Sequence, residues 1–260
     1  MATAKAQRRG LFDWLADDGA IVRIAFFALL AGTVGVLYID WRELSEAAGE
    51  TRMLPDIPLL PGLLPGFAPT PGGPVVTTDP ALLEQAMTVE LGAGGVLRLV
   101  GTIAPGTAEL VAAELTARGE YVSDVALNSP GGVVEEAIGI GRLLLERGYK
   151  TSVAAGAICA SSCPLILAGG KEREASRAAA IGVHQVYAMA RAGQVPVGAQ
   201  GAGMAMSEAQ RTTAAITRYL QETGVDPAVW VHALETPPEQ LYFLDAEELE
   251  RYRLATVLID

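Results

Sequence analysis

Cysteine, histidine and clustered positive charge are all scarce in this chain of 260 residues. There are two cysteines, too few for a small fold held together mainly by disulfides. Lysine and arginine total 19 against 30 acidic residues, giving a net charge of −11, and they form no basic stripe in the part expected to fold. Because phosphate binding needs clustered lysine and arginine, the composition argues against nucleic acid as a partner.

The longest uncharged apolar run covers residues 24–39, and residues 20–22 extend it upstream. A helix needs about 20 such residues to cross a bilayer, and Arg23 can reach toward the headgroups. Lys5, Arg8 and Arg9 precede the run, whereas acidic residues follow it. Because positive charge stays in the cytoplasm, we expect a cytoplasmic segment at 1–19 and a single-pass anchor in the cytoplasmic (inner) membrane at 20–41. The rest of the chain would be extracytoplasmic, that is, periplasmic. A cleaved signal peptide and a buried core helix are the alternatives.

Proline is concentrated between residues 55 and 80, where eight of the 15 prolines fall. Proline at this density prevents helices and sheet ladders. Residues 42–80 are therefore predicted to be a semi-extended linker that separates the membrane from a folded domain at 81–260.

Strand and helix patterns alternate along the domain. Strands are predicted at 87–91, 96–103, 122–127, 151–157 and 178–186, the first two forming a hairpin. Helices are predicted at 107–118 with Thr107 as N-cap, at 133–147, 160–168 and 207–223, from residue 226, and after a capping box at Asp245. Residues 192–205 read as a Gly- and Ala-rich loop. The alternation predicts an α/β fold with a mainly parallel sheet.

Three separate segments carry the parts of an acyl-transfer site. Residues 129–132 form a Ser-Pro-Gly-Gly turn after a strand, where glycine lets backbone N–H groups approach a ligand. Ser161 opens an apolar helix as a candidate nucleophile, and His184 ends a later strand as a candidate base. An oxyanion hole needs two N–H donors, which would be those of Gly132 and Ser162. Individually, each has an ordinary explanation: a turn, a helix cap and a core histidine.

Taken together, these residues resemble the Clp protease proteolytic subunit and its relatives in the Clp/crotonase superfamily. The resemblance is carried by Asn-Ser-Pro-Gly-Gly at 128–132, Ala160-Ser161, Leu-Ile-Leu-Ala-Gly-Gly at 165–170, and His184-Gln185. In particular, the chain resembles the membrane-anchored, Clp-like proteins described as predicted periplasmic proteins. It implies a fold of repeated ββα units, Ser161 as nucleophile, His184 as general base, and self-association into rings or trimers.

The chain departs from this family at the third member of the triad. The family has an aspartate two residues before a Phe-Leu pair, but Leu241 stands at that position here. Glu239 and Glu235 are the carboxylates near it in sequence. Since an acid orients the imidazole and stabilises its charged form, three possibilities stay open. The site is a Ser–His dyad, uses another carboxylate, or is inactive.

Cys159 and Cys163 flank the serine, four residues apart. In an oxidising compartment they can pair as a disulfide, and the alternative is two buried free thiols. A zinc site with His184 lacks a fourth ligand in the sequence, so neither a metal nor a cofactor is expected.

These expectations combine into an extracytoplasmic, membrane-anchored serine hydrolase that acts on peptide or protein substrates and forms a homo-oligomer. The alternative is a catalytically inactive Clp-like pseudo-enzyme that binds peptides or assembles partners at the membrane. A third possibility, acyl-CoA chemistry of the crotonase type, would leave Ser161 and His184 without a purpose.

Overall fold

The computed structural model describes residues 18–50, 73–186 and 199–260. It divides the chain into two units, residues 1–58 and 59–260. The predicted loop at 192–205 therefore lies partly outside the described residues, and most of the predicted linker does too.

The N-terminal unit is described by one helix, α1 (Asp18–Glu50). Its segment Val22–Arg42 is long and apolar enough to cross a membrane, the one such segment among the described residues, and none of it is buried. The helix continues to residue 50, so residues 42–50, which were predicted to belong to the linker, are helical. Residues 42–50 contain no proline, which explains why the helix runs on.

The domain is built on a six-stranded sheet with the order β1-β2-β3-β4-β6-β9. β1 is antiparallel to β2, and every following pair is parallel. The strands are β1 (Thr88–Leu91), β2 (Val96–Val100), β3 (Asp124–Asn128), β4 (Lys150–Val153), β6 (Arg173–Ser176) and β9 (Val257–Ile259). The fold is therefore α/β with a mostly parallel mixed sheet, as the alternating pattern predicts.

A smaller sheet with the order β5-β7-β8 carries the segments of interest. Its strands are β5 (Ile158–Ala160), β7 (Ala180–Val183) and β8 (Tyr242–Phe243). β5 and β7 are parallel, whereas β7 and β8 are antiparallel. A bridge between Ser129 and Cys159 connects the end of β3 to β5, so the two sheets meet beside the Ser-Pro-Gly-Gly turn.

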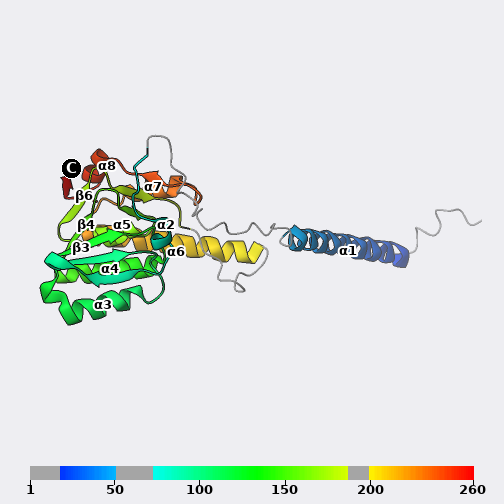
Figure 1. The fold of residues 1–260 in the computed structure, drawn as a ribbon. Coiled ribbons are helices and arrows are strands. Elements are labelled where there is room, and N and C mark those ends of the chain that lie inside the picture. Colours follow the sequence, from blue (N-terminus) through cyan, green and yellow to red (C-terminus); the bar gives the residue numbers. More distant parts are fainter. Residues whose placement is uncertain (1–17, 51–72, 187–198) are drawn as a thin grey trace, which may run out of the picture. The chain divides into compact units, whose positions relative to one another are not determined.

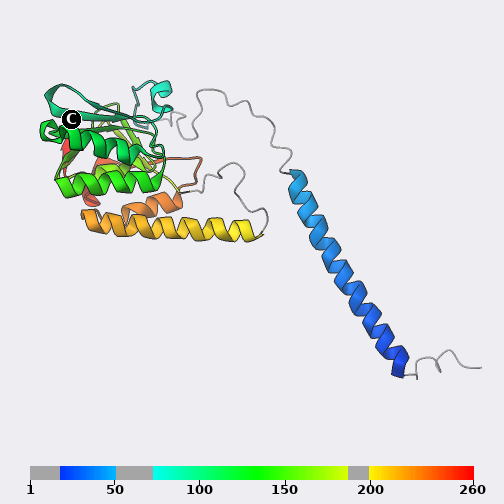
Figure 2. The ribbon, with the colours of Figure 1, turned by 90° about the horizontal axis from the view of Figure 1, so that it is seen from below.

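Helices cover the sheets, and α3 and α4 lie side by side in both views (Figures 1 and 2). The short helix α5 is buried on all sides, and α4 and α6 both pack against it. The helices of the domain are α2 (Pro80–Leu83), α3 (Thr107–Arg118), α4 (Val134–Arg147), α5 (Cys163–Ala168), α6 (Ala199–Thr223), α7 (Val229–Glu235) and α8 (Ala246–Arg251). The order β4-β5-α5 followed by β6-β7-α6 places one strand of each pair in each sheet.

The ordered domain begins before the predicted boundary at residue 81. Thr77 donates its backbone N–H to the carbonyl oxygen of Gly156 at 2.9 Å. The hydroxyl of Thr78 accepts a hydrogen bond of 2.7 Å from the side chain of Asn128 at the end of β3. The last residues of the predicted linker are thus part of the domain.

Several predicted elements differ from the structure in their ends. Thr107 is not the N-cap of α3; Gly106 is, and the carboxylate of Glu136 on α4 accepts from the N–H groups of Gly106 and Ala108. The helix predicted from residue 160 begins at Cys163 because Ala160 belongs to β5. The described part of the predicted loop, 199–205, is helical and opens α6. The capping box of Asp245 is confirmed.

Candidate active site

Parallel pairing of β5 with β7 brings the predicted serine and histidine together. Ala160 is the register partner of Gly182, and Ser161 N donates to the carbonyl oxygen of Gly182 at 2.9 Å. Because parallel strands end at the same edge of a sheet, the residues that follow them meet there. Ser161 Oγ lies 2.8 Å from His184 Nε2, which is hydrogen-bonding distance.

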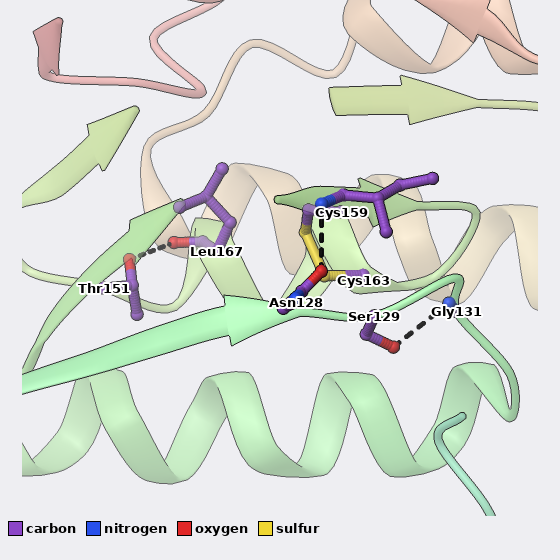
Figure 3. Close-up of a disulfide and its surroundings, with 8 residues drawn as sticks. Asn128, Ser129, Gly131, Thr151, Cys159, Cys163 and Leu167 are labelled. Atoms are coloured by element: carbon purple, nitrogen blue, oxygen red, sulfur yellow. Dashed lines mark hydrogen bonds between the residues drawn. A yellow bond between two sulfur atoms is a disulfide. The ribbon is translucent and has the colours of Figure 1, made fainter. Parts of the chain in front are cut away.

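Ser161 occupies a strained turn between a strand and a helix. Its φ angle is +60°, one of two positive φ values among the described non-glycine residues. Such a conformation costs on the order of 1–3 kcal/mol and persists only where the surroundings impose it. Here β5 precedes the turn and α5 follows it, and a disulfide joins Cys159 to Cys163 across it (Figure 3).

The disulfide excludes two buried free thiols, the alternative that the sequence left open. The Cα atoms of Cys159 and Cys163 are 5.1 Å apart, and both residues are fully buried. Their sulfur atoms are bonded to each other, so neither is a thiolate, the form in which cysteine binds zinc. Among the described residues, no group of three or more His, Cys, Asp or Glu side chains is placed to hold a metal ion.

The Ser-Pro-Gly-Gly turn packs directly against the serine. A methyl group added at Gly131 would lie 2.6 Å from Ser161 Cβ and 3.0 Å from Ser162 N, so only glycine allows this approach. Ser129, which is fully buried, accepts the Gly131 N–H with its hydroxyl at 3.1 Å (Figure 3). Gly131 and Gly132 have φ angles of +103° and +145°, which also require glycine.

The two predicted oxyanion donors flank this contact. The Ser162 hydroxyl donates to the carbonyl oxygen of Gly132 at 3.1 Å, tying the two segments together. The Gly131 carbonyl accepts from Ile103 N, so the Gly132 N–H of the same trans peptide points away from Ile103. Within the described parts of the chain, the N–H groups of Gly132 and Ser162 donate to no other group. Neither N–H is therefore committed to another described group, although Ser162 itself is buried.

The second ring nitrogen of His184 contacts a backbone carbonyl. Nδ1 lies 2.9 Å from the carbonyl oxygen of Pro238, in the loop between α7 and β8. A carbonyl can only accept, so Nδ1 carries the proton and Nε2 of the neutral ring is left to accept from Ser161. This is the tautomer that a general base for Ser161 requires.

The two carboxylates predicted from sequence do not occupy that position. Glu235 and Glu239 are both exposed, and the described acceptor of the Nδ1 proton is Pro238. Glu239, the next residue, nevertheless acts on the imidazole through its negative charge. The family position, Leu241, is an apolar residue packed against the small core cluster that includes Ile158 and Ala160.

Burial controls the protonation of the histidine. Loss of solvent around the half-buried imidazole lowers the pKa of His184 below its ordinary value. The hydrogen bond with Pro238 and the charge of Glu239 act in the opposite direction and offset part of this effect. His184 is therefore neutral, and able to accept a proton, at neutral pH.

A pocket of about 490 Å³ lies beside the two residues that follow His184 in the chain. It is lined by Gln185 and Val186, by one face of α6 and by Leu234 of α7. The lining is mainly apolar, and neither Ser161 nor His184 belongs to it.

Neither a protein-family model nor a curated protein matches this chain.

Sequence reasoning missed the role of Pro238. The group that contacts His184 is a main-chain oxygen, and every residue has one, so residue type carries no signal for it. The consecutive prolines at 237 and 238 indicate a rigid loop, but only the paired strands reveal where that loop lies.

Proposed function

We propose that this chain is a membrane-anchored, extracytoplasmic serine hydrolase with a Clp-like fold, acting on peptide or protein substrates. The observation that carries the proposal is the 2.8 Å contact between Ser161 Oγ and His184 Nε2, made by a serine held in a strained turn. A serine that only caps a helix does not require a histidine ring at hydrogen-bonding distance from its hydroxyl, whereas a nucleophilic serine does.

Each group has a defined task in the reaction. Ser161 Oγ attacks the substrate carbonyl carbon while His184 Nε2 takes the hydroxyl proton. The N–H groups of Gly132 and Ser162 bind the oxyanion that forms, and one such donor typically contributes about 3 kcal/mol. His184 then gives the proton to the leaving amine, the C–N bond breaks, and an acyl-enzyme remains. Water, deprotonated by His184, hydrolyses the ester and restores Ser161.

The disulfide and the apolar helix together support an extracytoplasmic location. Disulfides persist in oxidising compartments and are rare in the cytosol. A domain that contains the Cys159–Cys163 bridge is therefore expected on the far side of the membrane from the basic residues Lys5, Arg8 and Arg9. Charge and cysteine chemistry are independent, and they lead to the same orientation.

The topology is compatible with the Clp/crotonase resemblance. Two strands and a helix recur as β4-β5-α5 and β6-β7-α6, an order that supports the repeated ββα units implied by the resemblance. Of the segments that carry the resemblance, the Ser-Pro-Gly-Gly turn packs against Ser161, and His184 lies at hydrogen-bonding distance from it. By the same resemblance, we expect the chain to form a homo-oligomer.

A second candidate function is a peptide-binding scaffold without activity. It is favoured by the backbone carbonyl of Pro238 at the position where a triad has a carboxylate. A carbonyl stabilises an imidazolium less than a carboxylate does. The two functions differ in one measurable property, the reactivity of the Ser161 hydroxyl.

Fluorophosphonate labelling of the full-length chain in detergent micelles tests this reactivity. In this reaction Ser161 Oγ bonds to phosphorus, fluoride leaves, and His184 takes the hydroxyl proton. We expect Ser161→Ala to abolish labelling and His184→Ala to slow it by at least about 100-fold, the usual contribution of a general base. Ser123→Ala is the matched control, because this exposed serine bonds to the Gly94 carbonyl oxygen and lies in another part of the fold.

Equal labelling of the wild type and the Ser161→Ala variant would rule out the hydrolase mechanism. That result, with both proteins folded by circular dichroism, would leave the scaffold function as the better explanation.

A further inference from the structure

The second histidine, His232, belongs to a polar cluster near the site. His232 lies on α7, and its ring stacks on the ring of Tyr242 in β8, with centroids 4.4 Å apart and planes at 7°. Its Nε2 is 2.9 Å from the hydroxyl of Tyr252 and 3.5 Å from the carboxylate of Glu248. The sequence alone gives His232 no role beyond the core.

A buried carboxylate holds the Tyr242 side of this pair. The Tyr242 hydroxyl donates to Glu248 Oε1 at 2.6 Å. Glu248 is only 8% exposed, and its other oxygen accepts the Asp245 N–H in the capping box of α8. The positive charge of the Arg251 guanidinium, 3.6 Å from Glu248 Oε1, balances the negative charge of this carboxylate. A carboxylate with all these partners is a fixed anchor for the tyrosine ring.

The His232–Tyr242 stack closes the base of a loop, residues 236–241, that carries Pro238. His232 precedes this loop by four residues, and Tyr242 follows it directly. Within the base, the Thr236 hydroxyl donates to the His232 carbonyl oxygen at 2.7 Å. The two ends of the loop are therefore held together by stacked rings, and the two prolines restrict the backbone between them.

The same loop is bound to β7, the strand that His184 follows. Tyr242 is the register partner of Val183, the residue before His184. Gln185, the residue after it, donates its N–H to the Thr236 carbonyl oxygen at 3.0 Å and its side-chain amide to the Leu234 carbonyl oxygen at 2.7 Å. Both neighbours of His184 are thus attached to the segments that the stack joins.

We propose that His232 and Tyr242 are positioning residues, which through their stack fix the Pro238 carbonyl at His184 Nδ1. This rests on the proposed function, because it assigns how the base is oriented where Leu241 stands in place of a triad acid. The loop does the orienting work of that acid: it keeps the proton on Nδ1 and Nε2 toward Ser161. If the stack is lost, the loop ends separate, the Pro238 oxygen shifts, and the imidazole can turn or change tautomer.

Nitrogen-15 NMR of histidine-labelled full-length chain in micelles reads this tautomer directly. The chain has two histidines, so His232→Ala leaves His184 as the single imidazole signal. We expect a single Nδ1–H tautomer of His184 in the wild type and a mixture of tautomers in His232→Ala. Fluorophosphonate labelling should fall about 10- to 100-fold in that variant, the cost of a small misplacement of a catalytic group.

Two further variants separate positioning from general stability. His232→Phe keeps a ring to stack on Tyr242 and should restore the single tautomer and a labelling rate close to wild type. Tyr242→Leu keeps an apolar residue in β8 but removes the stack. It should produce the mixture of tautomers and the slower labelling expected of His232→Ala, and it replaces His232→Ala as the test if His232→Ala does not fold. Tyr149→Phe is the matched control, since it removes one part-buried tyrosine hydrogen bond, to the Gly119 carbonyl oxygen, from another region.

An unchanged His184 tautomer in folded His232→Ala or Tyr242→Leu would overturn the inference. So would a failure of His232→Phe to restore what His232→Ala loses. A tautomer that changes as expected in a chain whose wild type does not react with fluorophosphonate would instead support the positioning role and overturn the hydrolase function.

Discussion

The imidazole of His184 lies between a hydroxyl on one ring nitrogen and a backbone carbonyl on the other. A carboxylate in the second place would both orient the ring and carry a full negative charge. Pro238 provides the orientation with only a partial charge, and the exposed Glu239 adds a full charge without being the described acceptor of the Nδ1 proton. Orientation and charge stabilisation are therefore supplied by two neighbouring residues.

With the proposed hydrolase mechanism, this arrangement predicts that reactivity of Ser161 is lost at a pH below the ordinary pKa of histidine. Below its pKa, His184 is protonated at Nε2 and cannot accept the Ser161 proton. Because burial lowers the pKa of His184, the labelling rate should fall to half its plateau at a pH under the ordinary value of about 6.5. Rates measured from about pH 4 to about pH 9 give this midpoint.

Glu239→Gln should move that midpoint further toward acid. The negative charge of Glu239 raises the pKa of His184, so its removal lowers the pKa again. Glu235→Gln is the paired control, an exposed carboxylate with no part in the His184 shift, and should leave the midpoint in place. A midpoint above 6.5, or equal shifts in both variants, would contradict this electrostatic account.

At the scale of elements, the proposed oxyanion site depends on the turn between β3 and α4. A methyl group on Gly132 would collide with the carbonyl oxygen and carbon of Ile103. These are backbone atoms, so they cannot rotate away as the end of a flexible side chain can. The φ angle of +145° adds strain for any side chain. Gly132→Ala should therefore lower the free energy of unfolding by about 1–3 kcal/mol. It should also slow labelling about 100-fold through the displaced N–H group.

Gly139→Ala is the matched substitution, seven residues further on. Gly139 lies on the exposed side of α4, where a methyl group would meet only Ala108 Cβ at an ordinary 3.6 Å. This variant should raise the free energy of unfolding by about 0.5–1 kcal/mol, the helical preference of alanine, and keep the wild-type labelling rate. Urea denaturation and labelling of both variants test the pair; similar effects would show that the geometry at Gly132 is not special.

The elements that sequence predicts well are those with a clear apolar period. The two strands of the hairpin, α4 and the second half of α6 have one. β5 is only three residues long and buried throughout, and only Ser161 and Ser162 separate it from the buried helix α5, so the pattern does not show where the strand ends. The first residues of α6 are rich in glycine and alanine, which weakens any periodic signal although the segment is helical.

The candidate site, too, could be predicted from the sequence only in part. Ser161, His184 and Gly132 could be selected because their residue types and spacing suggest chemistry, and parallel pairing of β5 with β7 then brings the first two together. The tautomer of His184 could not be predicted, since a main-chain oxygen fixes it. The cap of α3 is a similar case. The sequence shows a local candidate, Thr107, but it does not show that the carboxylate of Glu136, 28 residues after Ala108, accepts the Ala108 N–H.

At the scale of the whole molecule, the charge distribution about α1 and the disulfide make one joint prediction on topology. In a bacterial host, the full chain should sediment with membranes and have Cys159 and Cys163 oxidised. Alkaline phosphatase, which is active only outside the cytoplasm, should be active when fused after Asp260. The reason is that Lys5, Arg8 and Arg9 favour the cytoplasmic side, which leaves the domain in the oxidising compartment.

Replacing these three basic residues by glutamate tests the cause. The variant should lose a large part of its phosphatase activity, and thiol alkylation after denaturation should detect reduced Cys159 and Cys163 in the misoriented fraction. Arg98→Glu, a reversal at an exposed position of β2 in the domain, is the control and should leave topology unchanged. Because the chain has no other cysteines, the alkylated fraction reports on this bridge alone. Reduced cysteines and an inactive fusion in the wild type would place the domain in the cytoplasm and contradict the proposed orientation.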